Sequence, residues 1–392
     1  MPLLPLTLPN SRSISYFYTM KKILKWMGIS LVLLLFVLAI ILYQRYGGGV
    51  EYGYVPSEPF LGKEQLYEFF SYEEPIGNVA ATPDTAHTRI FFTIHPESRP
   101  EGYKLCEIVD GKAVPYPSAD QSIYITPLGL FADRQNRLWV IDHGNHGFSG
   151  ARLLAFNLAT DELALEYTFS GDVAEKGSFF NDLSVTPDGK YVFIADVSFF
   201  GKQPSLVVFD VEKQQARSLL DGHKSVTNQG YVPVTPTKKM RFLGGLVDLM
   251  PGIDGLDVDP TGAYVYYAAM SHDSLYRVPV AACTDFSKTP ESIAAMVEAV
   301  SQKPLSDGIR VGPDGWVYIT DVEHQSVEWV DPAVGGKPKA LIQDSRIRWA
   351  DGLSFGGDGY CYLADSAIPD QMLRSKRHIH KMAPYFIFRW KF

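Results

Sequence analysis

The stretch LSDGIRVGPDGWVYITD, residues 305–321, decides the fold of this chain. Apolar and polar side chains alternate on both sides of the turn Pro313-Asp314-Gly315, and alternation around such a turn predicts a β-hairpin. The hairpin opens at Asp307 and closes at Asp321. Further copies of the same pattern occur along the 392 residues, so the repeat predicts the architecture.

Six copies align on their turns, at residues 76–93, 128–142, 181–196, 254–268, 307–321 and 351–365. Most starts lie 44 to 54 residues apart, and 73 residues separate the third from the fourth. A period in this range with short strands is typical of a β-propeller. The sequence therefore predicts an all-β, six-bladed β-propeller, with each hairpin supplying the inner two strands of a blade. A sandwich or two smaller β domains would explain six in-phase repeats poorly.

Three segments outside the hairpins carry expectations of their own. PESIAAMVEAVSQ (290–302) has the apolar spacing of a helix. NQGYVPVTPTKKMRFLGG (228–245), in the longest interval, reads as a loop laid over one face of the propeller. PYFIFRWKF (384–392) reads as a strand, and it is placed to close the ring by pairing strands from both ends of the chain.

The composition indicates a folded, turn-rich protein and argues against a nucleic-acid-binding one. Hydrophobic residues make up 46% of the chain, with 33 glycines and 26 prolines, as in a folded, turn-rich protein. The net charge of −8 argues against a nucleic-acid partner. Cys106, Cys283 and Cys361 lie far apart and form no CxxC pair, so they predict separate structural thiols, with one disulfide as the alternative.

The N-terminal region contains WMGISLVLLLFVLAIILY (26–43), eighteen residues without a charge. As a helix it is ~27 Å long, about the thickness of a hydrocarbon core. Lys21, Lys22 and Lys25 precede it, so the positive-inside rule predicts a single-pass protein with a cytoplasmic N-terminus and the propeller periplasmic or extracellular. The expected segments are a cytoplasmic part (1–25), a transmembrane anchor (26–43), a linker (44–60) and the propeller (61–392).

A cleaved signal peptide is the rival interpretation of this segment. The apolar run is long for one, and no small-x-small cleavage site follows it, which favours an uncleaved anchor. Met20 begins MKKILKW, a natural start for such a signal, so both Met1 and Met20 stay open as the first residue.

Alignment also selects candidate site residues. Six positions before the turn proline, copies three to six carry Asn181, Asp254, Asp307 and Asp351, whereas copies one and two carry Gly77 and Pro127. The first strand of each blade lines the channel of a propeller, so these four polar side chains are expected at one mouth of the channel.

The loops after the second strands should border the same mouth. They carry His143 and His146 in blade two, His272 in blade four and His324 in blade five. Of these we count His143, His272 and His324 as candidate ligand-binding residues, together with Asn181 and with Asn78 beside Gly77. The strand-ending acids Asp196, Asp321 and Asp365 are expected to be turn residues.

Three carboxylates in one place repel each other, which raises their pKa values or demands a cation. Asp254, Asp307 and Asp351 are therefore candidate ligands for a divalent ion, calcium above all, since hard cations prefer oxygen donors. Asp254 and Asp307 are also the candidate catalytic residues. No organic cofactor is expected. The alternative is that Asp-Gly and Asn-Asp simply form the turn before each strand by bonding their own backbone.

The motifs NDLSVTPDGKYVFIAD, SDGIRVGPDGWVYITD and WADGLSFGGDGYCYLADS resemble the bacterial branch of the major royal jelly and yellow protein family. That family is related to the six-bladed gluconolactonase–regucalcin group, and the resemblance covers about residues 60–392. In the lactonases a blade-one Glu, a blade-four Asn and a blade-five Asp hold one divalent ion, and a blade-three Asn binds substrate. The resemblance assigns Asn181 to substrate and Asp307 to metal, replaces the blade-four Asn by Asp254, and leaves Gly77 in place of the Glu.

These observations favour an extracytoplasmic, membrane-anchored propeller that binds a small polar ligand, with a divalent cation and hydrolysis of a lactone or ester as the first hypothesis. A non-catalytic module that binds a ligand or a protein is the alternative. A tautomerase acting on a quinone-like compound rests on the resemblance alone. No GxSxG motif is present, which argues against a serine hydrolase.

Overall fold

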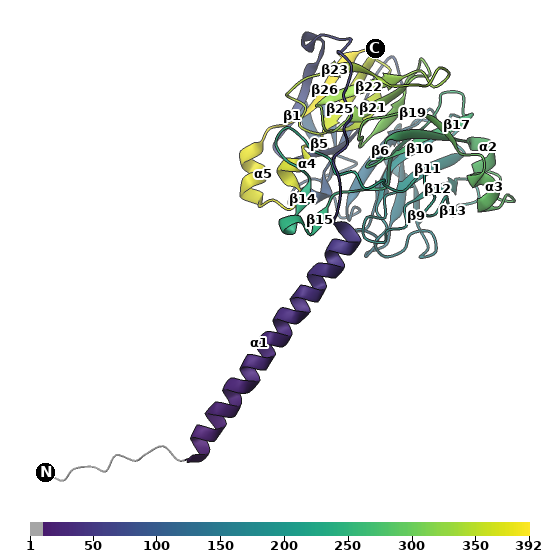
Figure 1. Ribbon diagram of the computed structural model, residues 1–392. Coiled ribbons are helices and arrows are strands. Elements are labelled where there is room, and N and C mark those ends of the chain that lie inside the picture. Colours follow the sequence, from purple (N-terminus) through teal and green to yellow (C-terminus); the bar gives the residue numbers. More distant parts are fainter. Residues whose placement is uncertain (1–10) are drawn as a thin grey trace. The chain divides into compact units, whose positions relative to one another are not determined.

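Each predicted hairpin is the inner pair of a four-stranded antiparallel sheet in the computed structural model, which describes residues 11–392 (Figure 1). Blades one to three consist of β2 (Ile76–Ala81), β3 (Ile90–Ile94), β4 (Leu105–Val109) and β5 (Lys112–Pro115); β6 (Pro127–Ala132), β7 (Arg137–Asp142), β8 (Arg152–Asn157) and β9 (Glu162–Thr168); and β10 (Phe180–Val185), β11 (Tyr191–Asp196), β12 (Ser205–Asp210) and β13 (Gln215–Leu219). The prediction of an all-β, six-bladed propeller is confirmed.

Blades four to six follow the same order, with one exception at the end. They consist of β16 (Ile253–Val258), β17 (Tyr264–Ala269), β18 (Ser274–Pro279) and β19 (Glu298–Gln302); β20 (Ile309–Val311), β21 (Val317–Asp321), β22 (Ser326–Val330) and β23 (Lys339–Gln343); and β24 (Ala350–Phe355), β25 (Tyr360–Asp365), β26 (Tyr385–Lys391) and β1 (Tyr67–Tyr72). The last blade takes its outermost strand from the start of the propeller.

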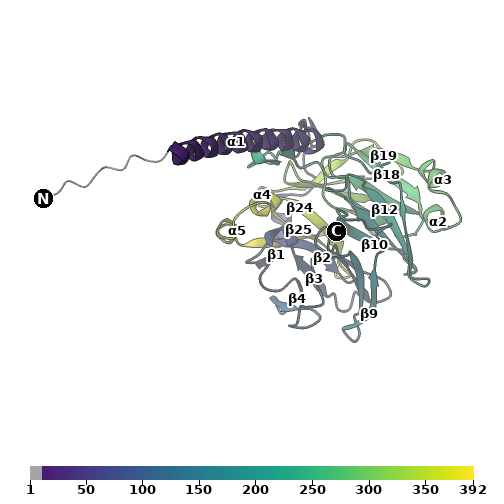
Figure 2. The same cartoon turned by 90° about the horizontal axis from the view of Figure 1, so that it is seen from below.

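That exchange closes the ring as the sequence predicts. Strand β26 pairs with β25 on one side and with β1 on the other, with Tyr67 opposite Arg389 and Tyr72 opposite Tyr385. Contacts between innermost strands run from β2 through β6, β10, β16, β20 and β24 back to β2. Strands β24 and β25 of the last blade lie beside β2 of the first (Figure 2). Neighbouring blades share buried apolar clusters, such as Phe91 of blade one with Leu138 of blade two. Because β2, β10 and β16 have neighbours on both faces, every side chain on them is buried.

Helices are short outside the N-terminal segment: α2 (Val280–Cys283), α3 (Pro290–Ala294), α4 (Ile368–Gln371) and α5 (Lys376–Met382), with 3-10 turns η1 (Lys63–Gln65), η2 (Pro96–Ser98) and η3 (Leu243–Gly245). The helix predicted over 290–302 is wrong in its second half. Residues 298–302 form β19 because the outer edge of β18 offers hydrogen-bond partners that an isolated helix lacks. The three cysteines are free and buried, as predicted.

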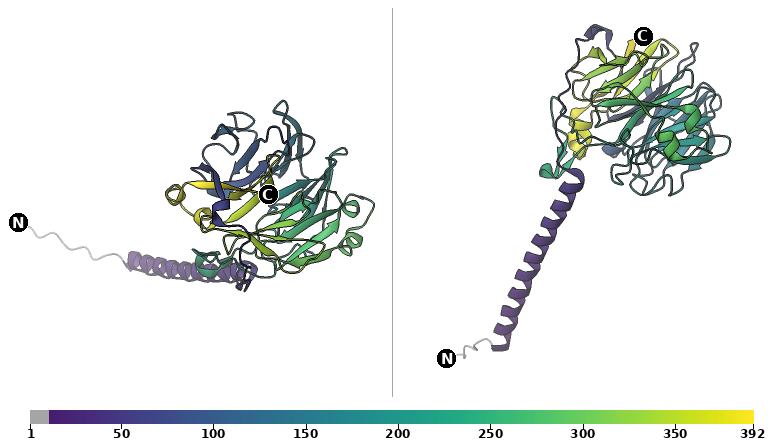
Figure 3. Two further views of the ribbon diagram at one scale, coloured as in Figure 1. Left: turned by 90° about the horizontal axis from the view of Figure 1, so that it is seen from above. Right: turned by 45° about the vertical axis from the view of Figure 1, so that its right-hand side comes forward.

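The chain divides into two compact units. One contains the propeller, residues 49–240 and 250–392; the other contains residues 1–48 and 241–249. Within the smaller unit, α1 (Ser11–Tyr46) includes a stretch from Tyr18 to Tyr46 that is long and apolar enough to cross a membrane (Figure 3). In place of part of the predicted loop, β14 (Arg241–Phe242) and β15 (Val247–Asp248) form a two-stranded hairpin.

Residues 50–61, most of the expected linker, run along the propeller. Val50 forms a parallel bridge with Tyr231, and the backbone N–H of Leu61 donates to the carbonyl oxygen of Leu341 at 2.7 Å. The hydroxyl of Tyr54 donates to Oε2 of Glu328, a fully buried side chain of blade five. This segment is therefore attached to blade five at Tyr54 and Leu61, and to the connection between blades three and four at Val50.

Candidate functional site

The candidate Asn and Asp residues lie at the start of the innermost strands or just before it, and in five of the six blades this place is a β-bulge. In blades one, two, three, four and six the register shifts at the same place, for example between Ile253 and Leu256 of β16. A bulge inserts an extra residue and changes the direction of the side chains there. Each bulge thus contains two consecutive residues, which we call the first and second bulge positions and which in blade four are Asp254 and Gly255. In blade five the equivalent residues, Asp307 and Gly308, directly precede β20, and the register does not shift there.

The second bulge residue is glycine where blades approach most closely. A Cβ atom at Gly308 would lie 2.3 Å from the carbonyl oxygen of Asp351, and one at Gly255 would lie 2.5 Å from the backbone nitrogen of Ile309. Only residues without a side chain fit at these separations. The starts of the innermost strands of blades four, five and six therefore approach each other closely at the backbone.

In blades one and three the second bulge position carries Asn78 and Asp182 instead. Asn78 Nδ2 donates a hydrogen bond of 2.7 Å to Asp182 Oδ1, and both side chains are buried. Asp182 was missed in the sequence because a strict alternation assigns one inward position per copy, whereas a bulge provides two. The sequence did contain a sign of Asp182, because the aligned residues of blades four, five and six are glycines.

The same register corrects blade two. Leu128, not Pro127, occupies the position of Asn181, because Pro127 pairs with Asp142 just as Phe180 pairs with Asp196. The turn of this copy lacks a proline, and its equivalent residue is Arg134 rather than Asp133. At the position where blades three to six carry a polar residue, blade two therefore carries the apolar side chain of Leu128.

The first bulge positions of blades three to six are all buried, and two of them have hydrogen-bond donors. The amide of Asn181 donates to Asp254 Oδ1, and Trp349 Nε1 donates to Asp307 Oδ2 at 2.5 Å. Asp254, Asp307 and Asp351 are each at most 7% exposed. The structure places these predicted residues together with Asp182 in one electrostatically linked group, which we call the acid cluster (Asp182, Asp254, Asp307 and Asp351).

Burial and mutual repulsion raise the pKa values of the carboxyl groups in the acid cluster. The pKa of Asp254 is raised well above its ordinary value by burial and then by Asp307. Burial, Asp307 and Asp182 raise the pKa of Asp351 in the same way. Burial raises the pKa of Asp307 to about 7 although the Trp349 hydrogen bond opposes it, and raises that of Asp182 to about 6. Near neutral pH such a cluster binds protons or a cation.

A buried arginine lies among the same inner strands. Arg310 Nε donates to the carbonyl oxygen of Leu353 at 2.8 Å, and its Nη1 lies 3.5 Å from Asp257 Oδ1. The guanidinium is 5.0 Å from the ring centre of Phe131 and opposes the rise in the pKa of Asp182. Asp257 also accepts from Ser184 Oγ at 2.5 Å, so this layer fixes blades three to six to one another.

With this geometry described, comparison with known proteins identifies the family. The sequence model of the major royal jelly protein family matches residues 125–339. The chain belongs to this family. None of the curated proteins compared with the chain matches it.

Solved structures related to this royal jelly family chain share its fold at low sequence identity. A gluconolactonase from Xanthomonas campestris is 12% identical with a TM-score of 0.53, and the match covers 88% of this chain and 97% of that one. Regucalcin, a calcium-binding protein from Agrobacterium tumefaciens, is 14% identical with a TM-score of 0.51, covering 86% and 95%. At these identities the likeness shows a six-bladed propeller and no activity.

The predicted histidines of this royal jelly family chain have local partners. His143 Nδ1 accepts the backbone N–H of His146 at 3.0 Å, and His272 Nδ1 accepts that of Ser274 at 3.0 Å. His324 Nδ1 lies 2.7 Å from Asp321 Oδ2, which raises the pKa of the imidazole. Burial lowers the pKa of His143 well below its usual value and that of His272 to about 4. Within residues 11–392 no hydrogen bond joins these three to the acid cluster, so their part in ligand binding stays a prediction.

A second group around His143 was only partly anticipated. Its ring lies 4.5 Å from that of Phe179, and His146 stacks on Phe179 at 4.8 Å while its Nε2 lies 3.1 Å from Glu97 Oε1. Nε2 of His143 is buried without a hydrogen-bond partner. Glu97 lies on η2 of blade one, and no repeat in the sequence marked it.

Two of the strand-ending acids are turn residues, as predicted: Asp196 Oδ1 accepts the backbone N–H of Ser198 at 2.9 Å, and Asp321 Oδ1 accepts that of Glu323 at 3.0 Å. Asp196 and Asp365 also bond the segment ahead of the first strand. Asp196 Oδ1 accepts the backbone N–H of Phe179 at 2.8 Å, and Asp365 Oδ1 accepts that of Trp349 at 2.7 Å. In both blades the acid at the end of the second strand fastens the segment that leads into the first. These acids therefore hold in place the residues next to the site.

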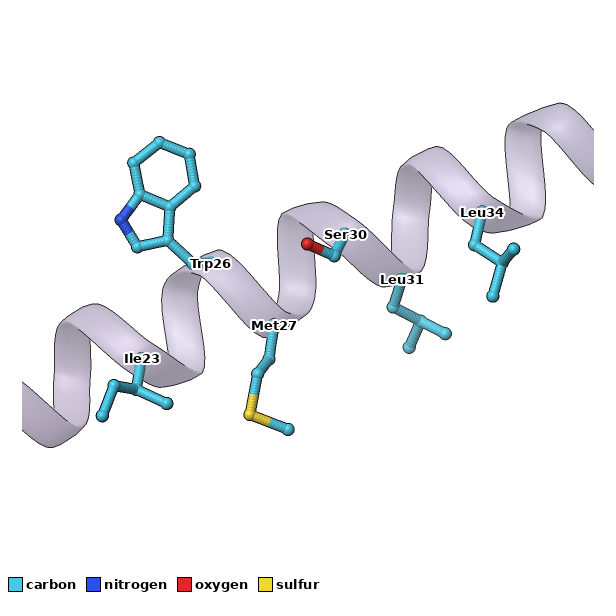
Figure 4. A pocket seen from close by; sticks show the side chains of 6 residues that line it. All are labelled: Ile23, Trp26, Met27, Ser30, Leu31 and Leu34. Atoms are coloured by element: carbon cyan, nitrogen blue, oxygen red, sulfur yellow. The ribbon is translucent and has the colours of Figure 1, made fainter.

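Two structural checks bear on ligands. Across the described range, residues 11–392, no group of three or more His, Cys, Asp or Glu side chains is arranged to hold a metal ion. The depression in Figure 4 is lined by Ile23, Trp26, Met27, Ser30, Leu31 and Leu34. All six belong to α1, so this depression is one side of an exposed apolar helix rather than an active site.

Proposed function

We propose that this royal jelly family propeller is held at a membrane by α1 and binds a small polar ligand at the acid cluster. The observation that carries the proposal is the buried group formed by Asn181, Asp254, Asp307 and Asp351 at equivalent positions of four successive blades. A propeller needs no charges at its centre for stability, since burying them is costly unless they are paired. Their presence there supports a binding role.

The anchor part of the proposal rests on the helix. The helix from Tyr18 to Tyr46 contains an 18-residue apolar window and lies outside the propeller unit. The lysines at 21, 22 and 25 place the N-terminus in the cytoplasm by the positive-inside rule and the propeller outside it. Segment boundaries at 25, 43 and 60 belong to the same proposal.

A divalent cation fits the chemistry of the acid cluster, which offers buried carboxylate oxygens that repel each other. Asp254, Asp307 and Asp351 would hold it, calcium being the first candidate. Their donor set is not arranged for a metal as it stands, because Asn181 and Trp349 already bond to two of the three acids. Binding would exchange those hydrogen bonds and the protons of the cluster for the cation.

Hydrolysis of a lactone or ester is the reaction that this site supports best. A bound divalent ion supplies Lewis-acid polarisation of a carbonyl group. The chain itself contributes Asn181, and with it Asn78, to orient the ligand, and Asp254 or Asp307 as a base towards water. A carboxyl group whose pKa is raised to about 7, as at Asp307, can accept and release a proton near neutral pH.

Calorimetry tests whether the acid cluster binds a cation, and an activity assay tests the reaction separately. Titration with calcium, magnesium, manganese and zinc in two buffers of different ionisation enthalpy should show binding that releases protons. Asp351→Asn should weaken that binding, whereas Asp172→Asn, an exposed carboxylate, should not change it. Turnover on a panel of sugar lactones should then be lost in Asp254→Asn. An absence of heat with all four ions would refute the metal part.

A non-catalytic binding module is the second candidate. The internal hydrogen bonds Asn181–Asp254, Trp349–Asp307 and Asn78–Asp182 favour it, because they give three of the buried acids a hydrogen-bond partner without any ion. Ligand binding without turnover and without a cation would support this candidate. A tautomerase acting on a quinone-like compound has no structural observation in its favour.

A further inference from the structure

The β14–β15 hairpin belongs with the N-terminal helix. Residues 241–249 fall in the same compact unit as α1, although about 200 residues separate them in the sequence. Strand β15 contacts α1, and the hairpin lies beside the C-terminal end of the helix in Figures 1 and 3. An element that joins a candidate membrane helix in this way is exposed to the same surroundings as the end of that helix.

The hairpin is built rigidly. Arg241 pairs with Asp248 through two contacts, Nε–Oδ1 at 2.5 Å and Nη2–Oδ2 at 2.9 Å, and Phe242 lies opposite Val247. Asp248 is fully buried. A bidentate pair of this kind fixes geometry as well as charge. The base of the hairpin therefore holds its tip in one place.

The tip carries an apolar side chain that the turn does not need. Leu243, Gly244 and Gly245 have φ angles of 50°, 67° and 100°. A left-handed conformation costs a residue with a Cβ atom about 1–2 kcal/mol, so glycine or asparagine would suit position 243 better. Leu243 nevertheless lies there with 62% of its surface exposed, next to Phe242.

The length of α1 indicates the depth at which the tip of the hairpin would lie in a membrane. The 29 residues from Tyr18 to Tyr46 extend ~43 Å as a helix, and a hydrocarbon core is about 30 Å thick. The last turn contains Tyr43, Arg45 and Tyr46, residues typical of the interface between lipid and water. A hairpin beside this turn lies at the level of the lipid headgroups.

We propose that residues 241–249 are a second membrane-contacting element, whose tip at Phe242 and Leu243 inserts into the interface of the leaflet where α1 emerges. The partner is the lipid bilayer itself. The proposal rests on the anchor role of α1 proposed above and adds a lipid contact from a distant part of the chain. It also gives a role to residues 241–245, the last part of the segment 228–245 that lies between two repeats.

Site-directed fluorescence on the full chain in lipid nanodiscs tests this contact. The three native cysteines are buried, so a single introduced cysteine can carry an environment-sensitive NBD label. Leu243→Cys is the main variant, and Leu246→Cys on the same tip serves if the first does not fold. Leu34→Cys reports the middle of α1, and Val334→Cys and Leu163→Cys report exposed positions on blades five and two.

The expected result is a blue-shifted emission at position 243 and quenching by shallow nitroxide lipids several-fold stronger than at positions 334 and 163. Emission at 243 equal to that at 334, with position 34 quenched by deep nitroxide lipids, would overturn the hairpin contact and leave the anchor intact. A water-exposed label at position 34 would instead refute the anchor. Equal quenching at 243, 334 and 163 would also overturn the proposal, because the contact would then not be specific to the hairpin.

Discussion

Asp307 has a single strong hydrogen-bond donor, the indole of Trp349 at 2.5 Å, in a site where burial already disfavours its charge. Trp349→Phe removes that donor and leaves the ring volume almost filled. We expect the pKa of Asp307 to rise further, because the hydrogen bond is the contact that lowers it. The free energy of unfolding should fall by about 1–3 kcal/mol, the cost of a buried group left unpaired.

A carbon-detected NMR titration of the aspartate carboxyls, with denaturant unfolding, measures both effects of Trp349→Phe. Trp316→Phe is the matched control, since Trp316 is half-buried on blade five, the blade of Asp307, and within the described residues its indole makes no hydrogen bond to the acid cluster. An unchanged titration of Asp307 would show that the Trp349 hydrogen bond does not set its proton affinity.

At the scale of the element, β-bulges in five of the six inner hairpins determine which residues lie at the candidate site. The number of blades and their inner strands were predictable, because turns and alternation are local and recur at a regular spacing. Asp182 and the register of Leu128 were not, because a bulge depends on pairing with the neighbouring strand and adds a residue that no local pattern reveals. The strand β19 was missed for the same reason, since its partner β18 lies twenty residues away.

Gly308→Ala tests whether the backbones of blades five and six must approach each other as closely as they do at Gly308. The added Cβ atom would lie 2.3 Å from the carbonyl oxygen of Asp351, and because backbone on both sides cannot yield cheaply, we expect a loss of about 1–3 kcal/mol in stability. Gly171→Ala adds the same atom where nothing lies within 4 Å, and it should stay within about 0.5 kcal/mol of wild type. Equal stabilities of the two variants in urea would contradict this account of the inner ring.

The closing strand is the element on which the ring depends. Phe388 of β26 is fully buried between blades five and six, whereas Phe392, one residue beyond the strand, is 46% exposed. Phe388→Ala should lower the unfolding free energy by about 3–5 kcal/mol, and Phe392→Ala by much less. Thermal melts of both variants measure the contrast, and a similar loss in the two would mean that β26 does not close the propeller cooperatively.

For the whole molecule, the acid cluster makes stability depend on pH in an unusual direction. An unfolded aspartate has a pKa near 3.9, whereas burial, Asp307 and Asp182 raise the pKa of Asp351 well above that value in the folded chain. Between these two pKa values the folded state binds a proton that the unfolded state has lost. The stability contributed by Asp351 is therefore complete below pH ~4 and declines as the pH rises, by up to about 1.4 kcal/mol per unit.

Asp351→Asn isolates this effect, because the substitution removes the titrating group and leaves the histidines and buried Lys303 unchanged in both proteins. The difference in melting temperature between Asp351→Asn and wild type should shift in favour of the variant from pH 5 to pH 8.5, and calcium should reduce that shift if the cluster binds it. Asp172→Asn, an exposed carboxylate, should show no such trend. A constant difference across the series would mean that Asp351 is ionised in the folded chain, and the cluster would then require a permanent cation rather than protons. The same series therefore decides between the two forms of the site, since protons and a divalent ion stabilise the acid cluster on opposite sides of its pKa values.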